Sequence, residues 1–365
     1  MKPSHVLMVT VFLALFSISI CSFGANFCVD NATDLQTALS NAEGNGGSDV
    51  IMVVQGTYSG NFLYDSGQGD SLALLGGYTA GCAGRAVDPA NSVLDGGESG
   101  YALRVVNSDG GDCAVDGFTL QNGNATGDGG GVYAEASSNS GTAGDVTLTN
   151  NIISSNTSAM GGGGIYARSY SQTGTAGNVI LLNNAVSQNS ANVGGGVFAS
   201  SYSISGTPGT VTFTNNTITG NSSVLYGGGA FLYAYSNEVP GGMVQCYNNI
   251  IRGNTGPAGA DIYLSNTGTA DGFTNDYAVM FGSWDNGAGT NIDADPLLAG
   301  DHRLLPRSPC IDTGTNAAPA LPAIDIEGDG RIIDGDRDGI ATVDMGADEY
   351  IPRDTGSQSL LLLLD

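Results

Sequence analysis

The block Asn178–Gly209 reads NVILLNNAVSQNSANVGGGVFASSYSISGTPG, and the residues on either side of it repeat the same pattern. Each copy carries paired asparagines, a further asparagine, a short apolar run after glycines, and a stretch rich in small residues. Two asparagine positions recur with separations of 33, 32 and 33 residues: Asn151, Asn184, Asn216 and Asn249, and likewise Asn156, Asn189, Asn221 and Asn254. A period of this length, held over successive copies, predicts a solenoid in which each copy forms one coil.

Within one copy, apolar and polar residues alternate over short stretches. Val179 and Leu181 face one way, and a further short apolar run begins at Val197 after the glycines. This alternation is typical of strands, and no copy holds a helix-length periodic stretch. Three short strands with turns fit one coil of a right-handed parallel β-helix, where each strand pairs with its counterpart about 4.8 Å away in the next coil. The predicted fold class is therefore all-β.

The asparagines and glycines are expected at the corners of the coils. A stacked asparagine can hydrogen-bond along its own column of side-chain amides and still tolerate a left-handed backbone. Glycine supplies positive φ and allows close approach at another corner. We expect these ladders to be structural.

A short helix is expected to cap the N-terminal end of the solenoid. Thr33 and Gln36 have the spacing of a capping box. One face of the following helix is apolar, and Gly44 would end it: Leu35, Ala38, Leu39 and Ala42. Composition then divides the chain into a signal peptide, an N-terminal cap with the first coils, the regular coils, an Asp-rich C-terminal cap and a tail: residues 1–24, 25–111, 112–290, 291–352 and 353–365.

The charge balance excludes several classes of partner. The formal net charge is -25, and Lys2 is the only lysine among the 365 residues. Nucleic acids and anionic membranes need lysine and arginine, so neither is an expected partner. A polyanionic substrate would also be repelled unless a cation bridged it to the chain.

The N-terminal residues have the features of an export signal. Lys2 precedes the apolar run Val6–Ile20, which is too short for a membrane span, and Ser22 and Gly24 fit a cleavage site after Gly24. The five leucines near the C-terminus also form too short a run, so no transmembrane span is expected in the mature chain.

Export permits disulfide bonds, and the repeat sorts the six cysteines. Cys28 and Cys82 lie outside the regular repeat and are the best candidates for a disulfide. Cys113 and Cys246 align with inward-facing apolar positions, so they are expected to be buried thiols.

Four segments near the C-terminus resemble the choice-of-anchor Q domain: NIDADPLL from Asn291, HRLLPRSPCIDTG from His302, DIEGDGR from Asp325 and VDMGADEY from Val343. The glycine-rich and TNN repeats are also similar to those of polymorphic outer-membrane proteins. The resemblance implies an exported bacterial β-helix at the cell surface or outside the cell, and no particular activity. One departure is that no sorting anchor follows Tyr350.

Enzymes such as pectate lyases and polygalacturonases share this fold, and their reactions require particular residues. Hydrolysis needs two carboxylates at a fixed separation, and proton abstraction next to a uronate needs arginine or lysine in a cleft. The regular coils offer only Arg168 and Arg252 as bases and few acids, and His302 is the only histidine after the signal. No catalytic constellation is visible. A divergent polysaccharide lyase or glycoside hydrolase stays as the alternative, and a groove that joins Arg168 or Arg252 to carboxylates would favour it.

An acidic stretch near the C-terminus matches the opening of a calcium loop. Asp334, Asp336 and Asp338 alternate before Gly339, while Asp344 falls one residue early for the closing ligand. These four aspartates are the predicted Ca²⁺ ligands, and a solvated acidic turn is the alternative.

One column of aromatic residues is a candidate ligand site. Tyr170, Tyr202 and Tyr235 recur at 32 and 33 residues, so stacked coils would align them. Aromatic rows can hold sugar faces, although the same rings could simply order long loops. The expected function is therefore binding, adhesion or a structural role at the cell surface, with carbohydrate or a cell-surface polymer as partner.

Overall fold

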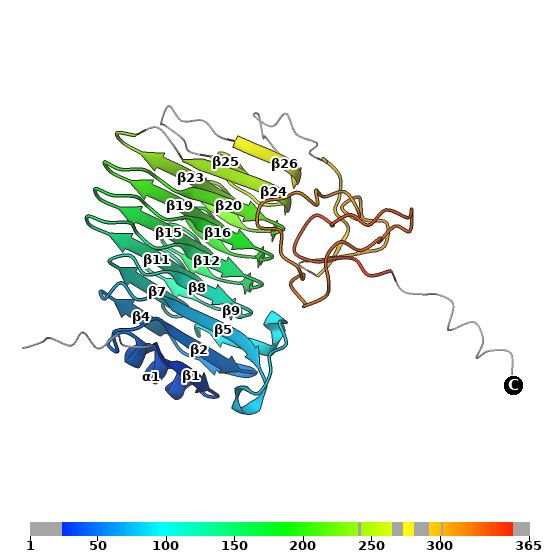
Figure 1. Ribbon diagram of the computed structural model, residues 1–365. Coiled ribbons are helices and arrows are strands. Elements are labelled where there is room, and N and C mark those ends of the chain that lie inside the picture. The colour runs from blue at the N-terminus through cyan, green and yellow to red at the C-terminus, as the bar shows by residue number, and fades with distance from the viewer. Residues whose placement is uncertain (1–23, 240–241, 265–272, 281–291, 301, 353–365) are drawn as a thin grey trace, which may run out of the picture.

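The chain forms an all-parallel β-solenoid of about six turns, the parallel β-helix predicted from the repeat (Figure 1). This computed structural model describes residues 24–239, 242–264, 273–280, 292–300 and 302–352. Residues 1–23 of the proposed signal peptide, which ends at Gly24, and the tail after residue 352 lie outside the described residues. Among the described residues, no helix is both long enough and apolar enough to cross a membrane.

Each regular coil contains four short strands, one more than the sequence predicted. The coil that begins near residue 145 consists of β12 (Val146–Thr149), β13 (Ile152–Ser154), β14 (Thr157–Ser158) and β15 (Ile165–Ser171). The asparagine pair between β12 and β13 bends the chain, and this bend divides what reads in sequence as one apolar stretch.

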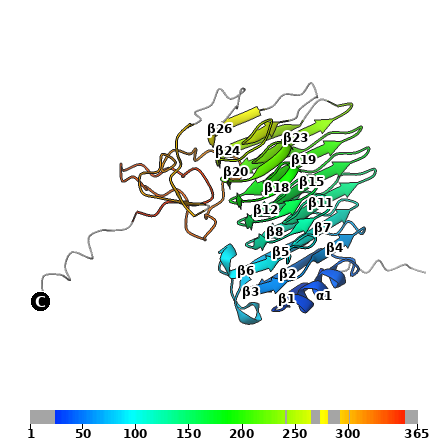
Figure 2. The same cartoon turned by 180° about the vertical axis from the view of Figure 1, so that it is seen from behind.

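Equivalent strands of successive coils pair in parallel and form four columns along the molecule (Figure 2). Column I contains β1 (Asn26–Val29), β2 (Asp49–Val54), β5 (Leu72–Tyr78), β8 (Cys113–Asp116), β12, β16 (Val179–Leu182), β20 (Thr210–Thr214) and the first part of β24 (Met243–Arg252). Column II contains β3 (Gly56–Ser59), β6 (Ser92–Asp95), β9 (Thr119–Gln121), β13, β17 (Ala185–Ser187), β21 (Thr217–Thr219) and the end of β24. Column III contains β10 (Asn124–Ala125), β14, β18 (Ser190–Val193) and β22 (Ser222–Tyr226). Column IV contains β4 (Phe62–Ser66), β7 (Leu103–Ser108), β11 (Val132–Ser138), β15, β19 (Val197–Ser203), β23 (Ala230–Ser236) and β25 (Ile262–Leu264).

The remaining elements are short or lie at the C-terminal end of the coils. Strand β26 (Phe273–Met280) pairs with β24. The only antiparallel strand pair among the named strands is formed by β27 (Leu298–Ala299) and β28 (Arg303–Leu304). Two 3₁₀ turns lie near the start, at η1 (Ala80–Cys82) and η2 (Pro89–Asn91).

The core consists of inward-facing residues that stack coil upon coil. In column I, Leu148 lies in register with Leu181, which lies in register with Phe213, and all three are fully buried. Cys246 follows Phe213 in the same row, and Cys113 pairs with Val146. Both cysteines are free and buried, which confirms their predicted role as small apolar groups.

The two asparagines of each pair have separate roles. The first, such as Asn150 or Asn183, has a left-handed backbone with φ of 53°. The second, such as Asn151, is fully buried, and its Nδ2 donates to Asn184 Oδ1 at 3.0 Å. The sequence predicted that a single asparagine would both adopt the left-handed backbone and form the side-chain ladder. In the structure the first asparagine of each pair adopts the left-handed backbone, and the second points its side chain inward and forms the ladder.

A short helix covers the N-terminal end, as expected. Helix α1 (Ala32–Ala42) buries the four apolar residues predicted for its inner face. Its cap differs from the prediction: Asn31 is the N-cap and accepts from the Asp34 backbone N–H at 2.9 Å, while Gln36 reaches the backbone of Leu63. An asparagine two positions before Thr33 therefore provides the cap.

The Asp-rich C-terminal section lies against the side of the coils, although the sequence predicted a cap at their end (Figures 1 and 2). We call residues 302–352 the flanking section. Asn183, Asn215 and Asn248, the left-handed asparagines between columns I and II, bond to it: Asn215 Nδ2 donates to the carbonyl oxygens of Asp344 and Gly346. The buried guanidinium of Arg331 donates to Asn183 Oδ1 at 2.7 Å and pairs with Glu349 at 3.3 Å. This row of asparagines thus provides hydrogen-bond donors for carbonyl oxygens of the flanking section, whose irregular backbone does not pair within a sheet.

Candidate functional site

The predicted tyrosine ladder lies on the outer face of column IV. Tyr170, Tyr202 and Tyr235 pair in register on β15, β19 and β23. Their ring centroids are 5.7 Å and 5.8 Å apart, and the rings stack. Alternation along each strand aims these rings outward, while the neighbouring residues point into the core.

A second and longer aromatic column lies beside it on the same face. Its five rings stack with centroids 4.8 Å to 5.3 Å apart, in the order Tyr133, Tyr166, Phe198, Phe231 and Tyr263. This column was not among the predicted sites, although the sequence carries its signal: in four successive coils an aromatic residue stands second after a run of three or four glycines, at Tyr133, Tyr166, Phe198 and Phe231.

Charged and polar side chains occupy the row between the two aromatic columns. Glu135 on β11 lies in register with Arg168 on β15, and their charged groups are 3.9 Å apart. Arg168 lies over the ring of Tyr170 at 4.3 Å, and the hydroxyl of Tyr133 donates to Glu135 at 2.7 Å. The structure therefore brings Arg168 together with a carboxylate.

A groove of about 710 Å³ opens where column IV meets column III. Three rings of the aromatic column form one wall together with Tyr233 and Tyr235: Phe198, Phe231 and Tyr263. Exposed side chains from the column III side form the other wall: Met160, Leu225 and Tyr226. The glycine corner between the walls has no room for side chains, because a Cβ on Gly195 would lie 2.1 Å from the Ser222 carbonyl oxygen.

The rings in this groove meet at several angles. Tyr233 lies edge-on to Phe198 and Phe231, at interplanar angles of 81° and 79°. Tyr226 is tilted by 46° from Tyr263. A face-to-face ladder covers its own ring faces, whereas rings at an angle leave faces open to a ligand.

Asp128 lies in the groove, half-buried, and accepts from the Gly161 backbone N–H at 2.7 Å. Burial raises the pKa of its carboxyl above the usual value, although Gly161 and Arg168 oppose this. Burial also raises the pKa values of Tyr166 and Tyr233, so both hydroxyls are neutral hydrogen-bonding groups at physiological pH.

The four aspartates predicted to bind Ca²⁺ do not all converge. Asp334 and Asp336 come together with Asp312, and one oxygen from each of the three lies within 4.8 Å of the others. Asp344 is fully buried and accepts from the Asp312 and Tyr350 backbone N–H groups, while Asp338 accepts from the Ile340 N–H. Binding of Ca²⁺ stays a prediction. It would be supported by a melting temperature that is higher in the presence of Ca²⁺ than in the presence of a chelator.

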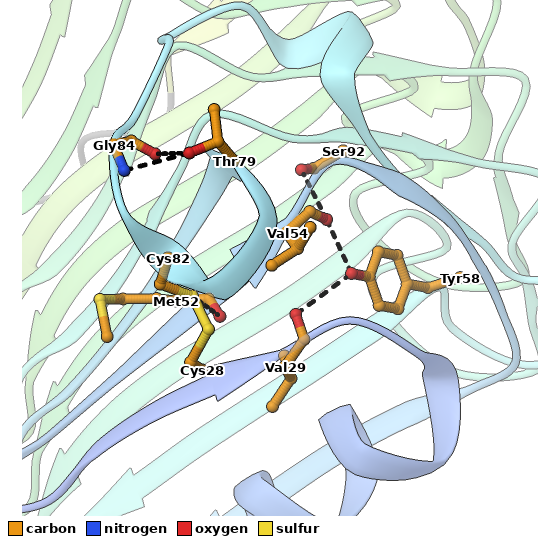
Figure 3. The surroundings of a disulfide bond; sticks show 9 residues. All are labelled: Cys28, Val29, Met52, Val54, Tyr58, Thr79, Cys82, Gly84 and Ser92. Atoms are coloured by element: carbon orange, nitrogen blue, oxygen red, sulfur yellow. Dashed lines mark hydrogen bonds between the residues drawn. A yellow bond between two sulfur atoms is a disulfide. The ribbon is translucent and has the colours of Figure 1, made fainter.

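Cys28 and Cys82 form a disulfide that ties β1 to η1 (Figure 3). Their Cα atoms are 5.9 Å apart, and the Tyr58 hydroxyl nearby donates to the carbonyl oxygen of Val54 at 2.7 Å. The pair therefore anchors the first strand, below helix α1, to the second coil.

The other two candidates for chemistry lie away from the groove. Arg252 donates to the carbonyl oxygen of Ala294, next to the C-terminal part of the chain. His302 lies 3.4 Å from Glu327 in the flanking section. Neither lines the groove of column IV.

The chain matches no known family model, no curated protein and no solved structure. The resemblance to the choice-of-anchor Q domain accordingly rests on the sequence alone, while the parallel β-solenoid rests on the structure.

Proposed function

We propose that this chain is an exported β-helix protein that binds a carbohydrate polymer in the groove where column IV meets column III, in an adhesion or other binding role. The observation that carries the proposal is the groove of about 710 Å³, walled by rings set at different angles. Sugars offer apolar C–H faces to aromatic rings and hydroxyls to polar groups, and both kinds of partner are present there.

The groove is a better candidate for the carbohydrate-binding site than the tyrosine ladder predicted from the sequence. Tyr170 and Tyr202 lie outside the groove and stack on one another, so their ring faces are largely covered, while Tyr235 at the end of the ladder lines the groove itself. Tyr226 is 42% exposed at the groove rim and is tilted against its neighbour, so its face is available.

Calorimetric titration with a panel of oligosaccharides would test this proposal. We expect Tyr226→Ala to weaken binding about tenfold, as loss of one aromatic contact of about 1.4 kcal/mol predicts. Tyr170→Ala is the matched control from the ladder and should bind within about twofold of the parent, with both variants keeping the parent's circular dichroism. The proposal fails if no glycan binds, or if the two variants lose affinity equally.

A second candidate function, a polysaccharide lyase or hydrolase, is favoured by one observation. Arg168, Glu135 and the nearby Asp128 place a guanidinium and two carboxylates beside the groove. Against it, Arg168 is already engaged by Glu135 and Tyr170. Burial lowers the pKa of Arg168, but Tyr166 and Glu135 outweigh that effect and raise it, which opposes action as a base.

Incubation with the same glycans separates the two functions. A binding protein leaves the number of reducing and unsaturated ends unchanged over many hours. New ends that depend on Glu135, and vanish in Glu135→Gln, would establish the enzyme instead.

A further inference from the structure

Among the described residues, the lining of the groove carries a single charged side chain, that of Asp128. Six of the other lining residues are aromatic: Phe198, Tyr226, Phe231, Tyr233, Tyr235 and Tyr263. A half-buried carboxylate beside several rings is an environment that favours a positively charged group, because ring faces carry negative potential.

The arginines nearest to the groove do not cancel this preference. Arg168 pairs with Glu135, and Arg104 pairs with Asp65 at 2.8 Å. The charges of these two arginines are therefore neutralised by the two carboxylates, and Asp128 leaves a net charge of -1 on this group of five side chains. At longer range, the formal charge of -25 attracts cations and repels anions.

The ring geometry agrees with this reading. Phe198 and Phe231 are parallel to within 3°, and Tyr233 stands nearly perpendicular to both. Tyr226 and Tyr263 add two further rings at an angle to each other. Both faces of Phe198 and Phe231 are covered by their stacked neighbours, whereas Tyr226 and Tyr233 are set at an angle to theirs and can turn a ring face toward one ammonium group.

We propose that the groove takes a glycan built of amino sugars with free, protonated amino groups, and that one such ammonium group sits against Asp128 among the rings. This inference rests on the proposed function and names its ligand class. Uronate polymers are excluded as ligands by the same charges. An N-acetylated sugar would keep its stacking contacts but lose the charge.

The test compares oligomers of equal length in calorimetric titrations at pH 6 and 0.15 M salt, where long-range attraction is screened beyond about 8 Å. The probes are a β-1,4-linked glucosamine oligomer, its N-acetylated counterpart, a galacturonate oligomer and a lysine oligomer. We expect the glucosamine oligomer to bind about tenfold or more tightly than the N-acetylated one, as one desolvated cation–π and charge contact predicts. The galacturonate and lysine oligomers should bind more weakly still.

Matched variants assign the preference to the groove. Asp128→Asn keeps an oxygen for the Gly161 N–H and should bring the two glucosamine oligomers to within about twofold of each other. Asp30→Asn removes the same unit of charge from an exposed carboxylate at the far N-terminal end and should leave the tenfold preference intact. Tyr226→Ala should weaken both oligomers.

The outcomes separate the two proposals. If the N-acetylated or galacturonate oligomer binds as tightly as the amine, and Tyr226→Ala weakens it, the cation inference is wrong while glycan binding stands. Equal losses in Asp128→Asn and Asp30→Asn, or tight binding of the lysine oligomer, also overturn the cation inference, since net charge would then explain the affinity. If no oligosaccharide binds, both proposals fail.

Discussion

At the scale of single residues, the buried asparagines hold successive coils in register. Asn189 Oδ1 accepts from both the backbone N–H and the side chain of Asn156, and its own Nδ2 donates to Asn221 Oδ1 and to the Ile153 carbonyl oxygen. The ladder ends at Asp261, which accepts from Asn254. An amide suits every interior step because it both donates and accepts, whereas a carboxylate can only accept and so fits at the end.

We expect Asn189→Ala to lower the free energy of unfolding by about 2–5 kcal/mol, because it leaves buried groups of two neighbouring coils without partners. Chemical denaturation followed by circular dichroism would measure the change. Asn139→Ala is a matched control at an exposed site, with an expected change within about 0.5 kcal/mol. Similar losses in both variants would contradict a structural role for the ladder.

At the scale of elements, the flanking section is joined to the coils by both apolar and buried polar groups. Two apolar clusters cross the junction: Ala185 packs with Ile326 and Ala347, and Ile250 packs with Leu304, Cys310, Ile311 and Met345. Arg331 and Glu349 are buried together, and Glu349 also accepts from the Ile332 and Ile333 backbone N–H groups. Removing one member of such a pair leaves the other charge buried alone, which makes this section sensitive to protonation.

We expect the flanking section to dock more firmly at pH 5 than at pH 8. Burial raises the pKa of Asp344 to about 8 and that of Asp348 to about 7, from an ordinary value of 3.8. The folded state therefore holds protons that the unfolded state releases, so stability falls as pH rises from about 4 to about 8 and levels off above that. Hydrogen-exchange protection factors of residues 302–352, corrected for the intrinsic pH effect, would measure it.

Asp344→Asn is uncharged at every pH and should flatten part of this dependence. The exposed Asp338→Asn serves as its control and should leave the parent's profile unchanged. Protection that rises between pH 5 and pH 8 in the parent would contradict the argument.

At the scale of the whole molecule, the N-terminal end is closed by helix α1 and tied by the disulfide. The bond between Cys28 and Cys82 spans a sequence separation of 54 residues. Because Cys28 is exposed, a reductant can reach it. A disulfide here fits the proposed export, since oxidising compartments preserve such bonds.

Reduction should lower the free energy of unfolding by about 4 kcal/mol, because it frees a loop of this length in the unfolded chain. Denaturation midpoints with and without reductant would measure the change. The double variant Cys28→Ser/Cys82→Ser should not respond to reductant. The prediction is wrong if mass analysis finds the bond open while the midpoint is unmoved.

The coil could be predicted from the repeat. The 32- and 33-residue spacing of the asparagines, the alternation at Val179 and Leu181 and the glycine runs are local patterns, and stacking identical units requires each position to meet its own copies. For the same reason the tyrosine column and the buried Cys113 could be read from the repeat.

The contacts at the edges of the coils depend on how distant parts of the chain pack together. The flanking section has no repeat, so nothing in its order of residues indicated that Arg331 would bond to Asn183 on the side of the solenoid. Asp128 and Tyr226 are nearly a hundred residues apart, and they share a groove because columns III and IV join at the glycine corner. The repeat period predicts which equivalent positions of successive coils contact one another. Contacts between non-equivalent positions depend on the angle at which the chain turns at each corner, and the repeat period does not determine that angle.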